Sequence, residues 1–197
     1  MSDPNEPQIG ERIAAIVIGA SAGGVGALSG LLGALPATLP VPVLIVLHVP
    51  RDRPSQLADL FSQSCLMPVA EAEDKAPLSP GKVWIAPPDY HLLVEDQATL
   101  ALSLDEPVMF SRPAIDPLFE SAAEVFGEAL LAILLTGASS DGSEGIAAVR
   151  RYGGHAWIQQ PDDAVSPMMP ASALAYAGAD EVLTLDAMRH RLGELFR

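Results

Sequence analysis

Ser21 and His48 each stand at the end of a short apolar run of the sequence, and Asp141 lies in the loop 136–142 that follows a third run. A serine hydroxyl becomes an effective nucleophile when an imidazole can take its proton, and a carboxylate fixes the tautomer of that imidazole. A serine, a histidine and an aspartate are therefore the ingredients of a hydrolytic triad. These residue types predict acyl-transfer chemistry if the fold brings the three side chains together.

The loop around the serine has the sequence Gly19-Ala20-Ser21-Ala22-Gly23-Gly24. Its Gly-x-Ser-x-Gly pattern resembles a nucleophile elbow, in which small neighbours permit a tight turn that exposes the hydroxyl. The N-terminus of a following helix would present backbone N–H groups to a developing oxyanion. The chain order Ser, His, Asp differs from the usual order of α/β-hydrolases, which place the acid before the histidine.

A phosphate-binding loop is the competing interpretation of the same glycines, and it fails two comparisons. No Lys-Ser/Thr pair follows Gly24, as a P-loop requires, and the dinucleotide fingerprint would place a glycine at Ser21. A dinucleotide fold would also favour an acidic residue after the second strand, where this chain has His48.

Structural roles remain open for each of the three residues. Ser21 could cap a helix, His48 could be an ordinary histidine at a strand end, and Asp141 could begin a capping box with Glu144. Three other carboxylates could also orient the histidine: Asp89, Asp105 and Asp116.

Apolar runs alternate along the chain with segments of helical spacing. The runs at residues 13–18, 43–47 and 129–135 are continuously apolar, which is typical of parallel strands buried on both faces. This alternation predicts an α/β fold with a doubly wound, mostly parallel sheet flanked by helices. Ligands bind beyond the carboxyl ends of the strands in such sheets, so the three reactive residues would share one edge.

The segment 69–110 departs from this alternation. It holds short strand-like pieces at 83–85, 91–94 and 99–104, separated by turn residues. We expect a small antiparallel hairpin excursion here rather than a second domain. Residues 1–12 are polar and contain proline, which indicates a flexible tail ahead of a single domain over 13–197.

The composition excludes several classes of function. Eleven Lys+Arg against 25 Asp+Glu give a formal charge of −14, which disfavours binding to nucleic acids or anionic membranes. The single Cys65 cannot form an internal disulfide, and no residue spacing suggests a metal site, so we expect no metal and no cofactor. Without a signal peptide or a membrane helix, a cytoplasmic protein is expected. Three further histidines are expected on the surface or in loops: His91, His155 and His190.

Several motifs in this order resemble the catalytic domain of the chemotaxis protein-glutamate methylesterases, the CheB type. The motifs are Gly19-Ala20-Ser21-Ala22-Gly23-Gly24, Leu47-His48-Val49-Pro50, Ile85-Ala86-Pro87-Pro88-Asp89-Tyr90-His91, Ser111-Arg112-Pro113-Ala114-Ile115-Asp116, Thr136-Gly137-Ala138-Ser139-Ser140-Asp141-Gly142 and Met169-Pro170. Each motif is weak alone, and the ordered set is specific.

The resemblance implies that Ser21 is the nucleophile, that His48 is the general base and acid, and that Asp141 orients His48. It implies hydrolysis of methyl esters on receptor glutamates, with deamidation of receptor glutamines in related members. Ala22 and Ala138 would supply oxyanion N–H groups, and Arg112 would line the substrate cleft or order a loop.

The resemblance also bears on partners and regulation. It implies a methylated receptor-like protein as substrate and a separate receiver protein as a possible regulator, because twelve residues before the first strand cannot hold a receiver domain. Two alternatives stay open. In the first, the chain is a catalytically impaired or repurposed interaction module, which fits the replacement of the usual Met and Gly by Ala138 and Ser139. In the second, the chain is a nucleotide-binding protein.

Overall fold

The computed structural model describes residues 12–50, 52 and 54–196. Within these residues, a seven-stranded sheet of order β3-β4-β2-β1-β7-β8-β9 has only parallel neighbours, and β5 and β6 form a separate antiparallel pair. The strands are β1 (Ala15–Ala20), β2 (Val43–Leu47), β3 (Val69–Glu71), β4 (Val83–Ile85), β5 (His91–Asp96), β6 (Thr99–Ser103), β7 (Leu130–Leu134), β8 (His155–Gln159) and β9 (Glu181–Leu183). The expected α/β fold class is confirmed.

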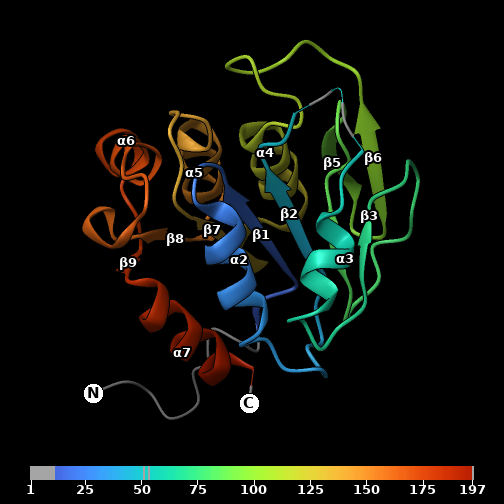
Figure 1. Cartoon of the computed structure of the whole chain (residues 1–197), viewed down its shortest axis with the longest axis horizontal. Coiled ribbons are helices and arrows are strands. Elements are labelled where there is room, and N and C mark those ends of the chain that lie inside the picture. The colour runs from blue at the N-terminus through green and yellow to red at the C-terminus, as the bar shows by residue number, and fades with distance from the viewer. Residues whose placement is uncertain (1–11, 51, 53, 197) are drawn as a thin grey trace.

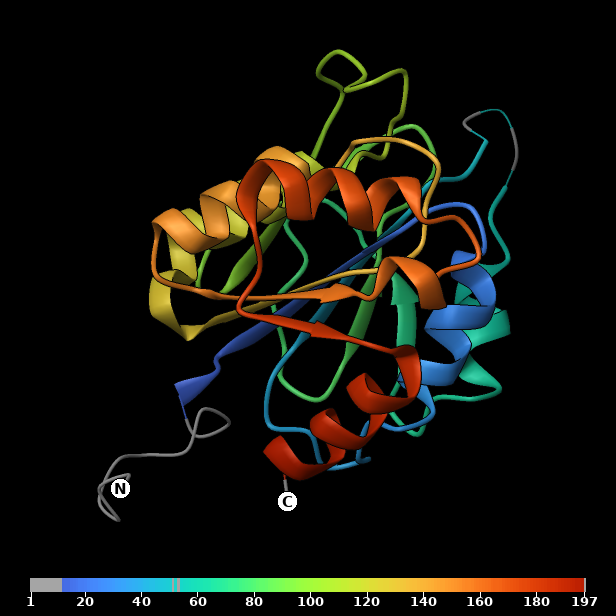
Figure 2. The same ribbon diagram turned by 90° about the vertical axis from the view of Figure 1, so that its left-hand side faces the viewer.

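Helices cover both faces of the large sheet (Figure 1). One face is covered by α2 (Gly24–Leu32), α3 (Leu57–Ser62) and α7 (Leu185–Leu195). The other is covered by α4 (Ile115–Phe126), α5 (Ser143–Arg151) and α6 (Met168–Ala177). Figure 2 shows α6 and α7 on opposite sides of β8 and β9. Short 3-10 turns at Gly127–Ala129 and Pro161–Asp163 complete the regular structure of the described residues.

The central strands contribute side chains to both cores. Ile16 and Ile18 of β1 pack on the α2 side, while Ala15 and Val17 pack on the α4 side, because successive strand residues point to opposite faces. Every residue of β1, β2 and β7 is buried. This two-sided burial is why these strands read as continuous aliphatic runs.

The antiparallel excursion is smaller than the sequence indicates. Residues 83–85, expected in the excursion, form β4, which pairs in parallel with β2 and β3 of the main sheet. Val83 and Ile85 join one core and Trp84 the other, so β4 is buried on both faces like the central strands. Turn residues on both sides conceal this in the sequence, because a three-residue strand carries too little pattern to reveal its partner.

The helices that follow β1 and β7 leave on opposite faces of the sheet. β1 and β7 are neighbours, yet α2 packs on one face and α5 on the other. The carboxyl ends of β1 and β7 are therefore a topological switch point, the place where α/β sheets bind ligands.

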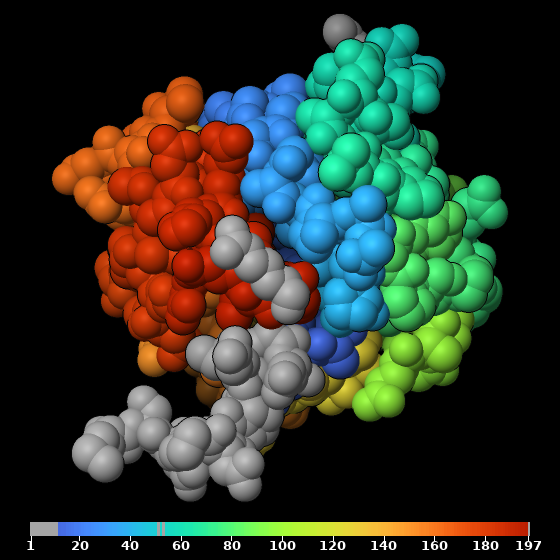
Figure 3. Space-filling view, turned by 90° about the horizontal axis from the view of Figure 1, so that it is seen from below, coloured from blue at the N-terminus to red at the C-terminus, as the bar shows by residue number. Residues whose placement is uncertain are grey.

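The C-terminal helix closes one face of the molecule. Figure 3 shows α7 in red beside the blue helix α2, and Met188 and Leu192 of α7 lie in the core beneath them. Of the expected tail at 1–12, all but Arg12 lies outside the described residues. Among the described residues, no helix has the length and apolar character needed to cross a membrane.

Candidate active site

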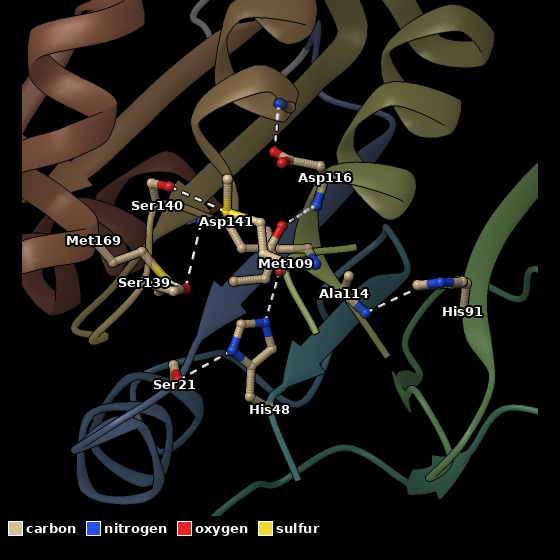
Figure 4. A network of polar contacts seen from close by, with 12 residues as sticks. Ser21, His48, His91, Met109, Ala114, Asp116, Ser139, Ser140, Asp141 and Met169 are labelled. Atoms are coloured by element: carbon tan, nitrogen blue, oxygen red, sulfur yellow. Dashed lines mark hydrogen bonds and ion pairs between the residues drawn. The ribbon is translucent and has the colours of Figure 1, made fainter. Parts of the chain in front are cut away.

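Ser21, His48 and Asp141 meet at the carboxyl edge of the sheet (Figure 4). Ser21 follows β1 directly, His48 follows β2, and Asp141 lies in the loop between β7 and α5. The two strands that carry Ser21 and His48 are adjacent and in register up to Ala20 and Leu47. The parallel sheet therefore brings together side chains that are far apart in the sequence.

The imidazole of His48 bridges the other two side chains. Its Nδ1 lies 3.1 Å from Ser21 Oγ, and its Nε2 lies 2.6 Å from Asp141 Oδ2. An ionised carboxylate only accepts hydrogen bonds, so Nε2 carries the proton and donates it to Asp141. The lone pair of Nδ1 then faces the hydroxyl of Ser21, which is the arrangement a general base needs.

Asp141 is buried and receives three hydrogen bonds. Besides His48, the backbone N–H of Ile115 donates to Oδ2 over 2.7 Å, and that of Asp116 donates to Oδ1 over 2.9 Å. Burial alone would raise the pKa of Asp141, but the hydrogen bonds from His48, Ile115 and Asp116 together lower the pKa below its ordinary value. Asp141 is therefore an anion held in a fixed position.

Ser21 and Asp141 do not have the helix-capping roles considered for them. The N-cap of α2 is Gly23 and that of α5 is Gly142, each without a side-chain cap, so Ser21 and Asp141 do not cap the helices that follow them. The Asp141 carboxylate instead binds the first N–H groups of α4, a helix that precedes it in the sequence. An anion at a helix N-terminus also interacts favourably with the helix dipole.

The other candidate carboxylates have different partners. Asp89 accepts from the Arg112 guanidinium over 2.8 Å, and Asp116 accepts from the backbone N–H of Gly145 over 2.7 Å. Asp105 is exposed. The carboxylate placed behind the His48 ring is Asp141.

Arg112 is engaged by the loop that precedes α4. Its Nη1 donates to the backbone carbonyls of Leu104 and Asp105 over 2.8 and 3.0 Å, and its Nε and Nη2 donate to Asp89. These contacts tie the loop 104–114 to the segment before β5. Of the two roles expected for Arg112, they support loop ordering.

The loop after β1 turns sharply below Ser21. Gly23 has φ of +79°, a left-handed conformation that favours glycine, and a Cβ there would lie 2.6 Å from Cβ of Val165. Ala22 is exposed, and its carbonyl accepts a hydrogen bond of 2.8 Å from Thr136 Oγ1. Ala138, in the loop after β7, is also exposed, so both predicted oxyanion residues lie in exposed loops at the carboxyl edge of the sheet.

Thr136 is a supporting residue that no pattern in the sequence indicates. Its hydroxyl donates to Ala22 and accepts from the N–H of Ser166 over 2.8 Å, so it joins the loops after β1, β7 and β8. Both partners are distant in the sequence, and a single threonine has no spacing pattern that could indicate them. The backbone donors Ile115 and Asp116 were missed because main-chain groups leave no residue signature.

His91 corrects an expectation from the sequence. It was expected on the surface or in a loop, but it begins β5 and is only 2% exposed. Its Nδ1 accepts from the backbone N–H of Ala114 over 3.2 Å, so its Nε2 carries the proton and donates to the carbonyl of Glu106 over 3.1 Å. His91 thus anchors both ends of the loop that leads into α4.

The described part of the chain contains no candidate metal site. No cluster of three or more His, Cys, Asp or Glu residues there could hold a metal ion. The acid–base groups that converge are those of Ser21, His48 and Asp141.

Two relatives with assigned names resemble most of this chain. One from Leptospira interrogans is 41% identical over 182 residues, which are 92% of this chain and 92% of its own length. One from Maricaulis maris is 42% identical over 177 residues, which are 88% of this chain and 44% of its own length. Both names contain the words protein-glutamate methylesterase/protein-glutamine glutaminase. The chain thus spans nearly all of the first relative and less than half of the second.

A solved structure and a family model agree with these relatives. The crystal structure of the Thermotoga maritima CheB methylesterase catalytic domain superposes with a TM-score of 0.88 at 32% identity, covering 93% of this chain and 98% of that chain. The family model described as CheB methylesterase matches residues 16–192. The chain belongs to the CheB methylesterase family.

Proposed function

We propose that this chain is a serine hydrolase that removes methyl esters from glutamate residues of a chemoreceptor-like protein. Ser21 is the nucleophile, His48 the general base and acid, and Asp141 the residue that orients His48. The observation that carries the proposal is the line of hydrogen bonds from Ser21 Oγ through both ring nitrogens of His48 to Asp141. The names of the relatives supply the substrate class.

The first half of the reaction forms an acyl-enzyme. Ser21 Oγ attacks the ester carbonyl while its proton passes to His48 Nδ1, and the imidazolium is stabilised by the Asp141 carboxylate at Nε2. The tetrahedral intermediate collapses when the C–O bond to the methoxy group breaks. His48 gives its proton to that oxygen, and methanol leaves.

The second half repeats these steps with water. His48 takes a proton from a water molecule, whose oxygen attacks the acyl-enzyme carbonyl, and the proton then returns to Ser21 Oγ as the glutamate carboxylic acid is released and ionises. A glutamine side chain follows the same course with ammonia as the leaving group, so one site serves both esterase and glutaminase reactions.

The oxyanion of both intermediates needs donors beside Ser21. We assign this role to backbone N–H groups at Ala22 and Ala138, on the loops after β1 and β7. The hydrogen bond from Thr136 to the Ala22 carbonyl restrains the loop after β1 that carries the Ala22 N–H. The N-terminus of α2 adds a favourable dipole on the same side.

The proposed reaction sets the substrate, and the resemblance to the family supplies the regulator. The substrate is a methylated receptor-like protein, and a separate receiver protein is the proposed regulator. The catalytic unit is the segment 13–197. The proposed steps use side chains and backbone groups of this chain alone.

Methanol release from a methyl-labelled receptor tests the proposal. The wild type should release methanol, Ser21→Ala should abolish release, and Ser62→Ala should leave it unchanged, since Ser62 is an exposed serine of α3. A Ser21→Ala protein that releases methanol at the wild-type rate refutes the assignment of the nucleophile.

The alternative function is an impaired or repurposed interaction module. The altered loop at Ala138 and Ser139 is the specific observation that favours it. A fluorophosphonate separates the two, because it labels an activated serine without needing the receptor. Labelling of folded wild type at Ser21 supports the hydrolase. A folded protein that is neither labelled nor active supports the module.

A further inference from the structure

The first turns of α4 and α5 are linked through Asp116. Its backbone N–H donates to Asp141 Oδ1 over 2.9 Å, while its side-chain Oδ1 accepts from the N–H of Gly145 over 2.7 Å. Asp141 precedes α5 and Gly145 lies in its first turn. One residue of α4 thus holds the α5 segment at two points, as Figure 4 shows for the carboxylates of Asp116 and Asp141.

The two helices also pack closely at Gly145. A Cβ at position 145 would lie 2.6 Å from Cβ of Phe119 and 3.2 Å from Asp116 Oδ1. Glycine is therefore required at this contact, and the Asp116 carboxylate reaches the N–H of residue 145 because no side chain stands between them. The spacing of α4 and α5 is consequently set by this contact and this hydrogen bond.

The environment of Asp116 makes it unusual among structural carboxylates. Its side chain is buried, and burial together with the nearby charge of Asp141 raises the pKa of Asp116 to about 7. It lines a cavity of about 340 Å³ with residues of the loops and of α5 and α6, among them Met109, Glu144 and Tyr176. Burial of an ionised carboxyl group lowers the net stability of the fold, so we interpret the link to Gly145 as positioning α5 and not as a source of net stability.

We propose that Asp116 is a positioning residue for the hydrolysis proposed above: its side chain fixes α5 against α4 and so holds the Asp141 carboxylate against His48 Nε2. The catalytic consequence of this inference rests on the proposed function. Asp116 acts through Asp141 and does not touch the reacting atoms. If the link is lost, the loop before α5 can move away from the α4 N-terminus, and Asp141 no longer orients the ring.

The proton on His48 Nε2 gives a signature that does not depend on substrate. A proton shared in a short bond to a carboxylate resonates far downfield in the ¹H NMR spectrum. We expect Asp116→Ala to shift this resonance upfield or to remove it through faster exchange. Asp116→Asn should retain it, because the amide oxygen can still accept from Gly145. Glu124→Gln, an exposed carboxylate of the same helix, should leave it unchanged.

Kinetics of methanol release test the consequence for catalysis. Asp116→Ala should lower kcat about 10- to 100-fold, as expected when a catalytic group is misplaced by about 1 Å, with KM nearly unchanged. Asp116→Asn should stay within about threefold of wild type. If Asp116→Ala does not fold, Asp116→Val takes its place, because valine fills part of the buried space, lacks the acceptor and has no δ atoms to press on Gly145.

The outcomes separate the two proposals. A folded Asp116→Ala or Asp116→Val protein with the wild-type downfield resonance overturns the positioning role. Loss of the resonance in that variant, with retention in Asp116→Asn, supports it even when the wild type releases no methanol. In that case the proposed function fails, and the structural role of Asp116 stands.

Discussion

The free energy of unfolding should depend on pH through Asp116, and Asp116→Asn should remove that dependence. The side chain is 6% exposed, and its pKa is raised from 3.8 to about 7 by burial first and by Asp141 next. In the unfolded chain the same carboxyl ionises near its ordinary pKa. Between these two values the folded state binds more protons than the unfolded state, so stability falls as the pH rises through this window.

The size of the effect follows from the two pKa values. Linkage gives a loss of about 2.5 kcal/mol in the free energy of unfolding between about pH 5 and about pH 8 from this group alone. Asparagine is neutral throughout and keeps an acceptor for the Gly145 N–H. The difference in the free energy of unfolding, variant minus wild type, should therefore grow by about 2.5 kcal/mol between about pH 5 and about pH 8. The two proteins should be nearly equal in stability near pH 4.

Urea unfolding at several pH values measures this difference. Comparing the variant with wild type cancels the contributions of titrating groups remote from Asp116, and Asp141, whose pKa is lowered, stays ionised in both proteins over this range. Glu124→Gln is the control, because that carboxylate is exposed in the folded chain. A difference between Asp116→Asn and wild type that stays constant from about pH 5 to about pH 8 would refute the reasoning.

Three further predictions concern the triad and its loops. Asp141→Asn should fold but lower kcat by about 10⁴-fold, because an amide cannot select the same tautomer of His48 or stabilise the imidazolium. A discontinuous assay of methanol release measures this. Activity within tenfold of wild type would contradict the orienting role. Gly23→Ala should destabilise the protein by about 1–3 kcal/mol in urea, because φ is +79° and Val165 blocks the added methyl group. An unchanged midpoint would disprove that account. Thr136→Val should lose about 1–3 kcal/mol of stability and slow fluorophosphonate labelling of the nucleophile, because the buried hydroxyl joins the loops after β1, β7 and β8; labelling at the wild-type rate would show that these loops keep their positions without it.

Much of the fold could be predicted because burial on both faces leaves a plain pattern. β1, β2 and β7 are continuous aliphatic runs since each face of the sheet is covered by helices. β4 was assigned to the wrong sheet because three residues carry no period, and its partners β2 and β3 are fixed by tertiary packing.

The candidate site also has residues that the sequence could predict and residues that it could not. Ser21, His48 and Asp141 could be selected because strand ends gather at one edge of a parallel sheet. The donors that hold Asp141 could not, since they are backbone groups at the start of α4 and any residue but proline supplies them. His91 was misjudged for a related reason: both of its partners are backbone groups outside its own strand.

The separation of the site residues along the chain has a consequence for synthesis. Ser21 and His48 are 27 residues apart, whereas His48 and Asp141 are 93 residues apart. A nascent chain that has emerged through β2 holds the serine and the histidine but lacks both the acid and the helix that anchors it. The proposed nucleophile therefore stays unactivated until α4, β7 and the loop that carries Asp141 have left the ribosome and docked, although β8 and β9 of the same sheet are still to follow.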